Sequence, residues 1–208
     1  MKLYTYFRSS AAYRVRIALN LKKLGYESVP IHLVQREQAK PEYLAVNPQG
    51  RVPALDLGGE VLIQSPAILE YLDEVHPDPR LLPADPLQRA KVRAACALIA
   101  CDIHPLNNLS PLSYLKRHFG QEQPAIDAWY RHWVTEGFTA LEQMLEPGPF
   151  TFGAAPSLAD VYLVPQVFNA RRYDVPLDAF PKIVAADAAC AELEAFRAAA
   201  PERQPDAA

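Results

Sequence analysis

The chain has 208 residues, half of them hydrophobic and 22% charged, which is typical of a globular protein large enough to bury a core. The formal net charge of −3 gives no reason to expect binding to nucleic acid, and no apolar run approaches the roughly 20 residues that span a membrane. Three cysteines without a Cys-x-x-Cys pair predict neither a disulfide framework nor a metal site, and with no signal-peptide pattern they indicate a cytoplasmic protein.

The chain begins with a predicted strand and helix. Residues 2–7 alternate in character and are rich in β-branched and aromatic side chains, which predicts a strand. Ser9 and Ser10 then offer N-caps to a helix. Apolar residues at helical spacing continue this helix to about residue 24, and Gly25 is expected to end it as the left-handed residue after the last turn.

Two more helices and three more strands are expected before residue 78. A strand at 26–34 is placed at a sheet edge or bulge because Pro30 lacks a backbone donor. Gly58-Gly59-Glu60 indicates a hairpin. The remaining elements are an irregular helix at 37–46, hairpin strands at 53–57 and 61–64, and a helix at 65–75. The resulting order, β-α-β-α-β-β-α, is that of a thioredoxin-like domain.

Beyond residue 78 the chain is expected to be helical. Prolines at 77, 79, 83 and 86 predict a linker, so we divide the chain into domains at 1–78 and 88–208 with a linker at 79–87. Helical apolar stripes occur at Val92, Cys96, Ile99 and Ile103 and at Ile126, Trp129, Trp133, Leu141 and Leu145. Further helices are expected at 157–172, where Ser157 and Asp160 form a capping box, and at 181–199, and the last eight residues are expected to be frayed.

The stretch 47–55, followed by Gln64 and Ser65, indicates a ligand-binding loop. Pro53 cannot donate a ladder hydrogen bond, so the neighbouring Val52 backbone is free to pair with something else. Ser65 lies at a helix start, where exposed N–H groups and the helix dipole favour a carboxylate. Together these features suit a small peptide that carries a carboxylate.

A thioredoxin-like domain joined by a proline-rich linker to an all-helical domain resembles the glutathione S-transferase architecture. Residues 7–19, Phe-Arg-Ser-Ser-Ala-Ala-Tyr-Arg-Val-Arg-Ile-Ala-Leu, resemble the zeta-class signature Ser-Ser-Cys-x-Trp-Arg-Val-Arg-Ile-Ala-Leu. The stretches 102–108, 163–167 with 170–172, and 203–206 also resemble zeta-class isomerases, so the resemblance covers the whole chain. Ala11 replaces the cysteine of the signature and Tyr13 its tryptophan; that cysteine is therefore not required here.

The resemblance implies an enzyme with an α/β N-terminal thioredoxin-like domain plus an all-α C-terminal domain, and glutathione as cofactor. The implied reaction is cis–trans isomerisation of maleylacetoacetate to fumarylacetoacetate by reversible thiolate addition, in aromatic amino-acid catabolism. The alternatives are isomerisation of maleylpyruvate in gentisate degradation, a general conjugating or dehalogenating transferase, and a non-catalytic stress or interaction protein. The implied partners are glutathione, a small maleyl dicarboxylate and a second copy of the chain in a homodimer, with no nucleic acid or membrane.

The resemblance also assigns the catalytic residues. Ser9 is expected to donate a hydrogen bond to the glutathione thiolate with Ser10 assisting, although on sequence grounds alone simple helix capping is the favoured interpretation of a serine here. Tyr6 is a rival donor, because other glutathione S-transferase classes use a tyrosine near the end of the first strand; its structural alternative is a core aromatic. Arg8 and Arg172 are expected to bind the substrate carboxylates. Arg171 is the weaker candidate, and Arg14 and Arg16 are expected to serve structure or solvent.

For glutathione, the resemblance assigns the Val52 backbone next to Pro53 to the cysteinyl moiety. Gln64 and Ser65 are assigned to the γ-glutamyl carboxylate, and Gln49 to the glycyl end. Residues of the helical domain expected to line the site are Asp102, His104 and Asn108. His104-Pro105 is equally explained as a helix kink, because Pro105 removes a backbone donor.

Overall fold

A computed structural model describes residues 1–207 of the chain, which form two compact units. The first contains Met1–Arg80 together with the C-terminal segment that begins at Ala191, and the second is Leu81–Cys190. The division expected from sequence, 1–78 and 88–208, instead places the C-terminal segment with the helices. The structure groups it with the first unit because the Asn20 side chain donates to the Ala195 carbonyl at 3.0 Å, and the Arg16 Nε donates to the Ala199 carbonyl at 3.0 Å.

The first unit is built on a mixed four-stranded sheet of order β2-β1-β3-β4. The strands are β1 (Lys2–Thr5), β2 (Glu27–Pro30), β3 (Ala54–Asp56) and β4 (Val61–Ile63). Strand β1 pairs in parallel with β2 and antiparallel with β3, and β3 with β4 forms the expected hairpin. Pro30 ends an edge strand, as its missing donor predicts. The expectation that this strand continues to residue 34 is wrong.

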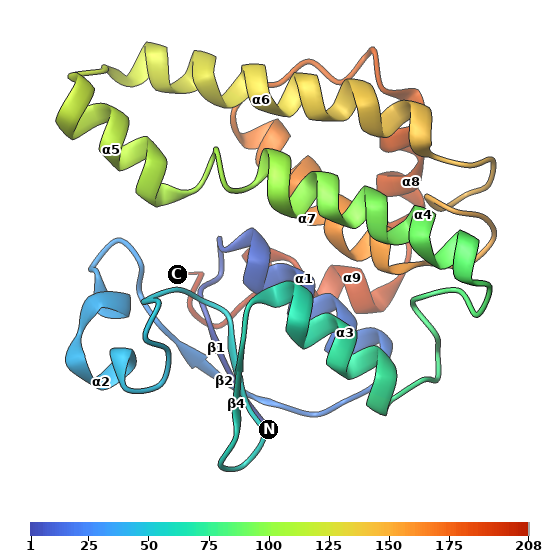
Figure 1. The fold of residues 1–208 in the computed structure, drawn as a ribbon, viewed down its shortest axis with the longest axis horizontal. Helices are drawn as coiled ribbons and strands as arrows, with labels where there is room; N and C mark the ends of the chain where they lie inside the picture. Colours follow the sequence, from blue (N-terminus) through green and yellow to red (C-terminus); the bar gives the residue numbers. More distant parts are fainter. Residues whose placement is uncertain (208) are drawn as a thin grey trace. The chain divides into compact units, whose positions relative to one another are not determined.

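Helices pack on this sheet and fix its core. In Figure 1, α1 (Ser10–Leu21), α3 (Ser65–Val75) and α9 (Glu194–Ala199) lie together beside the sheet, and α2 (Pro41–Leu44) lies apart from them. The segment predicted as an irregular helix is a 3₁₀ turn, η1 (Glu37–Ala39), followed by α2 (Pro41–Leu44). The expectation that Gly25 ends the first helix is wrong.

The end of α1 is a Schellman motif three residues earlier than expected. Lys23 adopts the left-handed conformation with φ 55°, its N–H donates to the Asn20 carbonyl at 3.0 Å, and the Leu24 N–H donates to the Leu19 carbonyl at 2.9 Å. The preceding Lys22 places its ammonium 2.8 Å from the Asp73 carboxylate with both side chains buried. This buried ion pair ties the end of α1 to α3.

The second unit is helical. Its elements are α4 (Pro86–Ala97), the π-helix η2 (Leu98–Ile103), α5 (Leu109–Phe119), α6 (Gln123–Met144), α7 (Leu158–Arg172) and α8 (Pro181–Ala191). The predicted stripe at Val92, Cys96, Ile99 and Ile103 is buried, as expected. A Cβ on Gly137 of α6 would overlap the Ile103 side chain, so the close packing of α6 on η2 favours glycine there.

Two further expectations for this unit meet different outcomes. Ile126, Leu141 and Leu145 of the second predicted stripe are buried, as expected. Trp129 and Trp133 are half-buried, and the middle of the α6 core face is formed by Tyr130, Val134 and Phe138, so the predicted face of this helix is partly wrong. The capping box of Ser157 and Asp160 at the start of α7 is confirmed.

The C-terminal region differs most from the sequence expectation. The single helix expected at 181–199 is two helices, because α8 ends at Ala191 and α9 begins at Glu194. The expectation of a frayed terminus is wrong for residues 201–207: Pro201–Arg203 form the 3₁₀ turn η3, and the side chains of Gln204 and Asp206 make hydrogen bonds to the backbone. Ala208 lies outside the described residues.

Candidate functional site

The turn between β1 and α1 places Ser9 at the N-cap of the first helix. The Ser9 hydroxyl oxygen accepts the Ala12 N–H at 3.2 Å, and the Ser9 carbonyl accepts the Tyr13 N–H at 2.8 Å. A serine hydroxyl has one proton and two lone pairs, so accepting from the helix leaves the proton available for a ligand. Helix capping and thiolate donation, which the sequence left as alternatives, are therefore compatible in one residue. Ser10 is buried within the first turn of the helix.

Arg8 is exposed and is oriented by the two aromatic residues that precede it. Its Nη2 donates to the Tyr6 hydroxyl at 3.1 Å, and its guanidinium carbon lies 4.9 Å from the centre of the Phe7 ring. The Tyr6 ring is 4% exposed and packs edge-on against Phe7. The core aromatic expected as the structural alternative for Tyr6 is what the structure contains, with its hydroxyl engaged by Arg8.

The loop before β3 presents the Val52 backbone next to a cis Val52-Pro53 peptide bond. The preceding carbonyl, that of Arg51, accepts hydrogen bonds from the Tyr43 hydroxyl at 2.6 Å and the Asn47 amide at 2.7 Å. Burial raises the pKa of Tyr43, which keeps its hydroxyl protonated as a donor. In the described part of the chain, no protein hydrogen bond engages the Val52 backbone N–H or C=O, so this edge is open to a ligand.

The start of α3 brings together three of the predicted glutathione residues. Gln64 precedes the helix with φ 70°, a conformation that is strained for a residue other than glycine. Its side chain makes no capping bond and its amide donates to the Gln49 Oε1 at 2.7 Å. The Ser65 hydroxyl is buried and accepts from the Arg14 Nη1 at 3.5 Å. A strained residue before an uncapped helix start is the local geometry expected of an anion site.

Arg14 and Arg16 have the structural role that the sequence favoured. Both are fully buried in the first unit. Burial lowers the pKa of Arg16 to about 10, although the charges of Tyr26, Tyr13 and Asp206 oppose this shift. Neither guanidinium is exposed to a substrate.

In the second unit, the predicted residues Asp102, His104 and Asn108 follow one another around the break between α4 and α5. Asp102 is exposed in the π-helix η2, whose irregular ladder includes a His104 N–H to Ile99 carbonyl bond of 2.9 Å. Asn108 caps α5, and its side-chain oxygen accepts the Leu109 N–H at 2.7 Å. The kink weighed for His104-Pro105 is therefore present, as a π-helical break before α5.

Arg172 and Arg171, adjacent at the end of α7, have different partners. Arg171 forms a 2.7 Å ion pair with the Asp187 carboxylate, whose side chain is 9% exposed. Arg172 is exposed, donates to the Tyr173 hydroxyl at 3.2 Å and lies 4.9 Å over the Tyr173 ring. Sequence reasoning preferred Arg172 as the ligand-binding member, and the ion pair of Arg171 agrees with that preference. The binding roles of the residues in this unit stay predictions.

Residues that sequence reasoning missed connect these two parts of the helical unit. The Tyr173 ring stacks on the buried Tyr130 at 3.6 Å between centroids and 7° between planes. The Tyr130 carbonyl in turn accepts from the Asn107 side chain at 3.4 Å. Asn107 precedes Asn108, so this chain of contacts links Arg172 to the loop before α5. No local sequence pattern predicts a stack between residues 43 positions apart.

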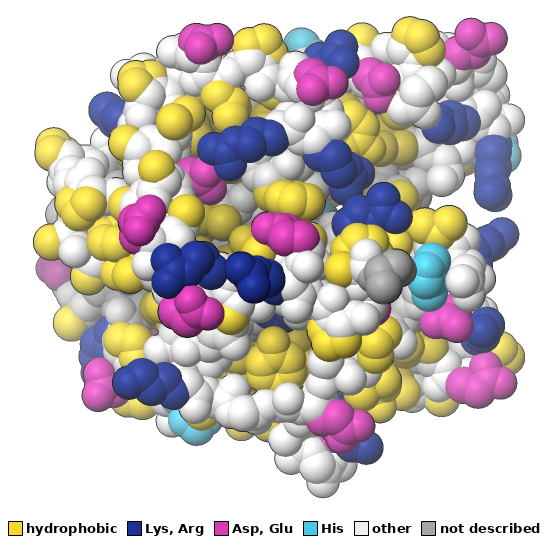
Figure 2. Space-filling model, turned by 180° about the vertical axis from the view of Figure 1, so that it is seen from behind, with side chains coloured by type: hydrophobic (Ala, Val, Ile, Leu, Met, Phe, Trp, Pro, Cys, Tyr) yellow, Lys and Arg dark blue, Asp and Glu magenta, His cyan; other side chains and the backbone are white. Residues whose placement is uncertain are grey.

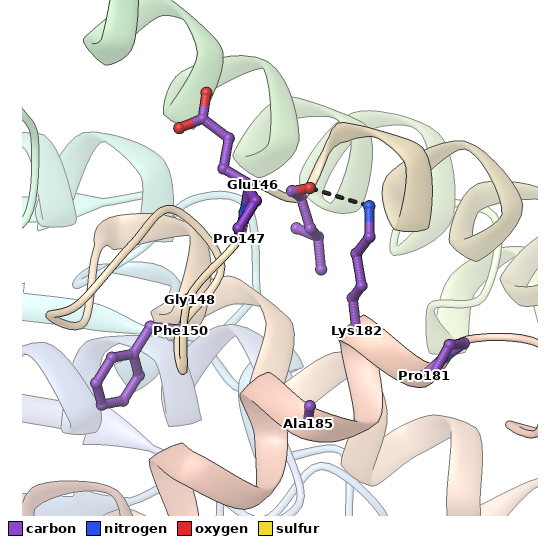
Figure 3. Close-up of a pocket in the computed structure, with 8 residues that line it drawn as sticks. Glu146, Pro147, Gly148, Phe150, Pro181, Lys182 and Ala185 are labelled. Carbon is purple, nitrogen blue, oxygen red and sulfur yellow. Dashed lines mark hydrogen bonds between the residues drawn. The ribbon is translucent and has the colours of Figure 1, made fainter.

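A separate pocket of about 360 Å³ lies in the helical unit between the end of α6, the loop after it and the first turns of α8 (Figure 3). Lys182 closes one side by donating to the Leu145 carbonyl at 3.2 Å. None of the predicted site residues lines this pocket. It is a gap between two helices and the loop after the first of them, and we assign it no catalytic role.

The surface and the remaining candidate sites carry little further signal. On the face drawn in Figure 2, basic, acidic and hydrophobic side chains are interspersed. Within residues 1–207, no group of three or more His, Cys, Asp or Glu side chains has the arrangement of a metal site. None of the helices in the described chain is both long and apolar enough to cross a membrane.

Comparisons with known proteins agree with the architecture. The models for the glutathione S-transferase N-terminal and C-terminal domains match residues 1–74 and 123–201. The maleylacetoacetate isomerase of Pseudomonas aeruginosa is 53% identical over 99% of this chain and 98% of its own.

Two solved structures extend the comparison to three dimensions. A holo structure of maleyl pyruvate isomerase, described as a bacterial zeta-class glutathione S-transferase, has a TM-score of 0.99 at 53% identity and covers 100% of both chains. A maleylacetoacetate isomerase from Anaeromyxobacter dehalogenans, with dicarboxyethyl glutathione and citrate bound in its active site, has a TM-score of 0.89 at 40% identity. The match covers 100% of this chain and 93% of that one.

Proposed function

Because this chain belongs to the zeta class of the glutathione S-transferase family, we propose that it catalyses the glutathione-dependent isomerisation of maleylacetoacetate to fumarylacetoacetate. The observation that carries the proposal is the N-cap geometry of Ser9. Its oxygen accepts from Ala12 and its proton remains for a ligand at the positive end of α1.

The reaction needs the cis double bond to become a single bond for long enough to rotate. The glutathione thiolate adds to one alkene carbon, and the electron pair moves into the conjugated carbonyl as an enolate. After rotation about the central bond the enolate expels the thiolate, which leaves the trans alkene and unchanged glutathione. A dicarboxyethyl glutathione bound in the active site of the Anaeromyxobacter relative supports thiolate addition to a dicarboxylate of this kind.

The energy needed to make the thiolate is within reach of Ser9 and α1. A free thiol has a pKa near 8.5, and lowering it by about two units takes roughly 2.7 kcal/mol. A helix N-terminus contributes about 0.3–1 kcal/mol, or about 2 when partly buried. A hydrogen bond to a charged group adds about 1.5–3 kcal/mol. The helix alone is marginal, and the helix with one aimed hydroxyl is sufficient.

The remaining residues divide between cofactor and substrate in this proposal. The Val52 backbone beside Pro53 pairs with the cysteinyl moiety of glutathione, and the start of α3 at Gln64 and Ser65 binds its γ-glutamyl carboxylate. Gln49, which holds the Gln64 amide, lies toward the glycyl end. Arg8 and Arg172 bind the substrate carboxylates by bidentate hydrogen bonds, and Ser10 assists Ser9. Asp102, His104 and Asn108 are the helical residues assigned to the site.

Maleylpyruvate is the second candidate substrate, because a relative named for it is as similar, at 53% identity, as the one named for maleylacetoacetate. Turnover of both substrates by the purified protein, with and without glutathione, decides between them. We expect both to require glutathione and maleylacetoacetate to have the higher kcat/KM. Equal turnover without glutathione would reject the mechanism, and a higher kcat/KM for maleylpyruvate would reassign the substrate. Conjugation of an aryl halide faster than either isomerisation would favour a general transferase.

We also propose that the enzyme acts in the cytoplasm as a homodimer. The family resemblance supports both statements. Native mass measurement at micromolar concentration checks the assembly, with a mass of twice 23.1 kDa expected. A mass of one chain would contradict the dimer.

A further inference from the structure

The C-terminal tail folds back onto the turn that carries the proposed catalytic residues. After α9, the Gln204 side-chain amide donates to the carbonyls of Ala198 and Ala200 at 2.9 and 3.0 Å, which directs the chain back across the first unit. Asp206 then reaches the turn after β1: its Oδ2 accepts the Phe7 backbone N–H at 2.9 Å, across 199 residues of sequence.

The Phe7 peptide is held on its other side by a buried arginine. The Arg16 Nη2 donates to the Phe7 carbonyl at 3.0 Å, and its Nη1 donates to the Thr5 hydroxyl at 3.0 Å. The same guanidinium donates through Nε to the Ala199 carbonyl at the end of α9. Arg16 therefore joins the turn to the segment that leads into the tail, and Asp206 completes the enclosure of the Phe7 backbone.

Phe7 directly precedes the two residues proposed to act on substrate and thiolate. The Arg8 guanidinium lies on the Phe7 ring, and the Ser9 N–H donates to the Tyr6 carbonyl at 2.9 Å. The path of the backbone through Phe7 therefore determines the directions of the Arg8 guanidinium and the Ser9 hydroxyl. A displacement of about 1 Å at a reacting geometry costs on the order of 100-fold in rate.

Placing Asp206 here carries a desolvation cost that stability alone does not explain. Its second oxygen, Oδ1, is buried and has no hydrogen-bond partner among the described residues. Burying a carboxylate with one oxygen unmatched carries a desolvation cost. The positive charge that interacts with it is that of Arg16, whose pKa the Asp206 charge raises and which is itself fully buried.

We propose that Asp206 is a positioning residue, and that the C-terminal tail is a clamp that holds the Arg8 guanidinium and the Ser9 hydroxyl in the positions needed for catalysis. The proposal rests on the proposed function for its activity assay. The clamp acts through the Phe7 backbone, and Asp206 touches neither substrate nor glutathione.

The test compares Asp206→Ala with Asp206→Asn, which keeps an acceptor oxygen for the Phe7 N–H, and with Glu202→Ala, which removes an exposed carboxylate from the same tail. We expect Asp206→Ala to raise the KM for the maleyl substrate and lower kcat, with about a tenfold loss in kcat/KM. The glutathione KM, set at the loop before β3 and at α3, should stay within about twofold. Asp206→Asn should recover most of the loss, and Glu202→Ala should match the unmodified enzyme.

Outcomes that would overturn the clamp are distinct from failure of the proposed function. Unchanged kinetics in Asp206→Ala would reject the positioning role of Asp206. Equal increases in the KM for glutathione and in the KM for the maleyl substrate would also reject it. Amide hydrogen exchange at Phe7 provides a readout without substrate: protection should fall in Asp206→Ala and persist in Asp206→Asn, and unchanged protection in Asp206→Ala would reject the contact. If the unmodified enzyme isomerises neither maleyl compound, the proposed function fails, and the exchange measurement still decides the clamp. If Asp206→Ala does not fold, Asp206→Leu takes its place. A normal kcat/KM in Asp206→Leu would overturn the proposal, and so would equal amide exchange at Phe7 in Asp206→Asn and Asp206→Leu.

Discussion

The two units hold their candidate residues in different ways. In the first unit, Ser9 and Gln64 lie at helix starts, where the backbone fixes them: one caps α1, and the other is held in a strained conformation before α3. In the second unit, Arg172 is exposed and rests on a single tyrosine ring. The residues assigned to the cofactor are thus fixed by the backbone at helix starts, whereas the arginine assigned to the substrate is held only by side-chain contacts with its neighbour Tyr173.

Adjacent arginines show the same contrast on a smaller scale. Arg171 is half-exposed and is committed to the buried Asp187, and Arg172 has only its neighbour Tyr173 as a hydrogen-bond partner among the described residues. A guanidinium already paired with a buried carboxylate is unavailable to a dicarboxylate ligand, because releasing it leaves an unpaired buried charge. Arg172 has no such obligation.

The largest effect is expected from Ser9, one of the residues that the backbone fixes at a helix start. Ser9→Ala should lower kcat for isomerisation by tenfold or more, because the thiolate loses its hydrogen bond. Loss of the cap also costs about 0.5–2 kcal/mol of stability, so Ser9→Gly is the matched variant: it removes the hydroxyl at a cost of only a few tenths. Both variants should be slow and Ser9→Thr should recover activity. Normal rates in Ser9→Gly, and in the double variant that also carries Ser10→Ala, would move the donor role to Tyr6.

Arg172→Ala tests the exposed arginine that we assign to the substrate in the second unit. We expect the KM for the maleyl substrate to rise about five- to tenfold, less than a fully buried charged pair would give, because the guanidinium is exposed. The glutathione KM should stay within about twofold. Arg203→Ala, which removes an exposed arginine from η3, is the control. An unchanged substrate KM and rate in Arg172→Ala would remove this residue from the site.

Arg171→Gln should act on stability and leave the KM values unchanged. Burial raises the pKa of the Asp187 carboxyl, and the neighbouring Arg171 opposes the shift. A carboxyl whose folded pKa is raised is disfavoured as an anion, so the cost appears as pH rises through that pKa and vanishes below the unfolded value near 3.9. Without Arg171 the cost grows. We expect about 1 kcal/mol of destabilisation at pH 7, measured by urea unfolding.

The sign of the pH dependence separates this ion pair from a simple loss of packing. The difference between Arg171→Gln and the unmodified protein should shrink as pH is lowered toward 4, because Asp187 becomes protonated in both. A difference that stays constant between pH 7 and pH 4 would show that the ion pair does not contribute. An altered substrate KM would instead show that both arginines bind the ligand.

The smallest effect is expected from Gln49→Ala. Its side-chain oxygen holds the Gln64 amide at 2.7 Å on an exposed surface, where such a bond contributes about 0.5–1.5 kcal/mol. The KM for glutathione should rise about threefold, with kcat unchanged. Gln35→Ala, at another surface position, is the control. A fall in kcat as large as that of Ser9→Ala would mean that the loop positions the thiol itself.

Local patterns predicted the parts of this molecule that are determined locally. Pro30 ends an edge strand, Ser157 and Asp160 form a capping box, and Ser9 caps α1, because each depends on residues within three or four positions. The hairpin at Gly58-Gly59 is of the same kind. The stripe predicted for α6 was only partly right. Ile126 and Leu141 are buried as expected, but Tyr130 and Val134 take the core positions expected of the two tryptophans, because neighbouring faces of the helix have similar apolar character and only tertiary packing chooses between them.

Long-range contacts were beyond the sequence. The tail from Pro201 was expected to be frayed because it is short and polar, yet Asp206 binds the Phe7 backbone 199 residues away. The stack of Tyr173 on Tyr130 that supports Arg172 is likewise invisible in any local window. The candidate residues were identified through the family signature, and the contacts that orient them were found only in the structure.

In the proposed mechanism, Ser9 and the start of α1 keep the sulfur of bound glutathione ionised. Thiolate absorbance of the binary complex, titrated against pH, measures this directly. We predict a thiol pKa of about 6.5 in the unmodified enzyme, two units below the free value, and a pKa of about 8 in Ser9→Gly, where the helix start still lowers it slightly. A pKa near 8.5 in the unmodified enzyme, or one that is unmoved by removing the hydroxyl, would contradict it.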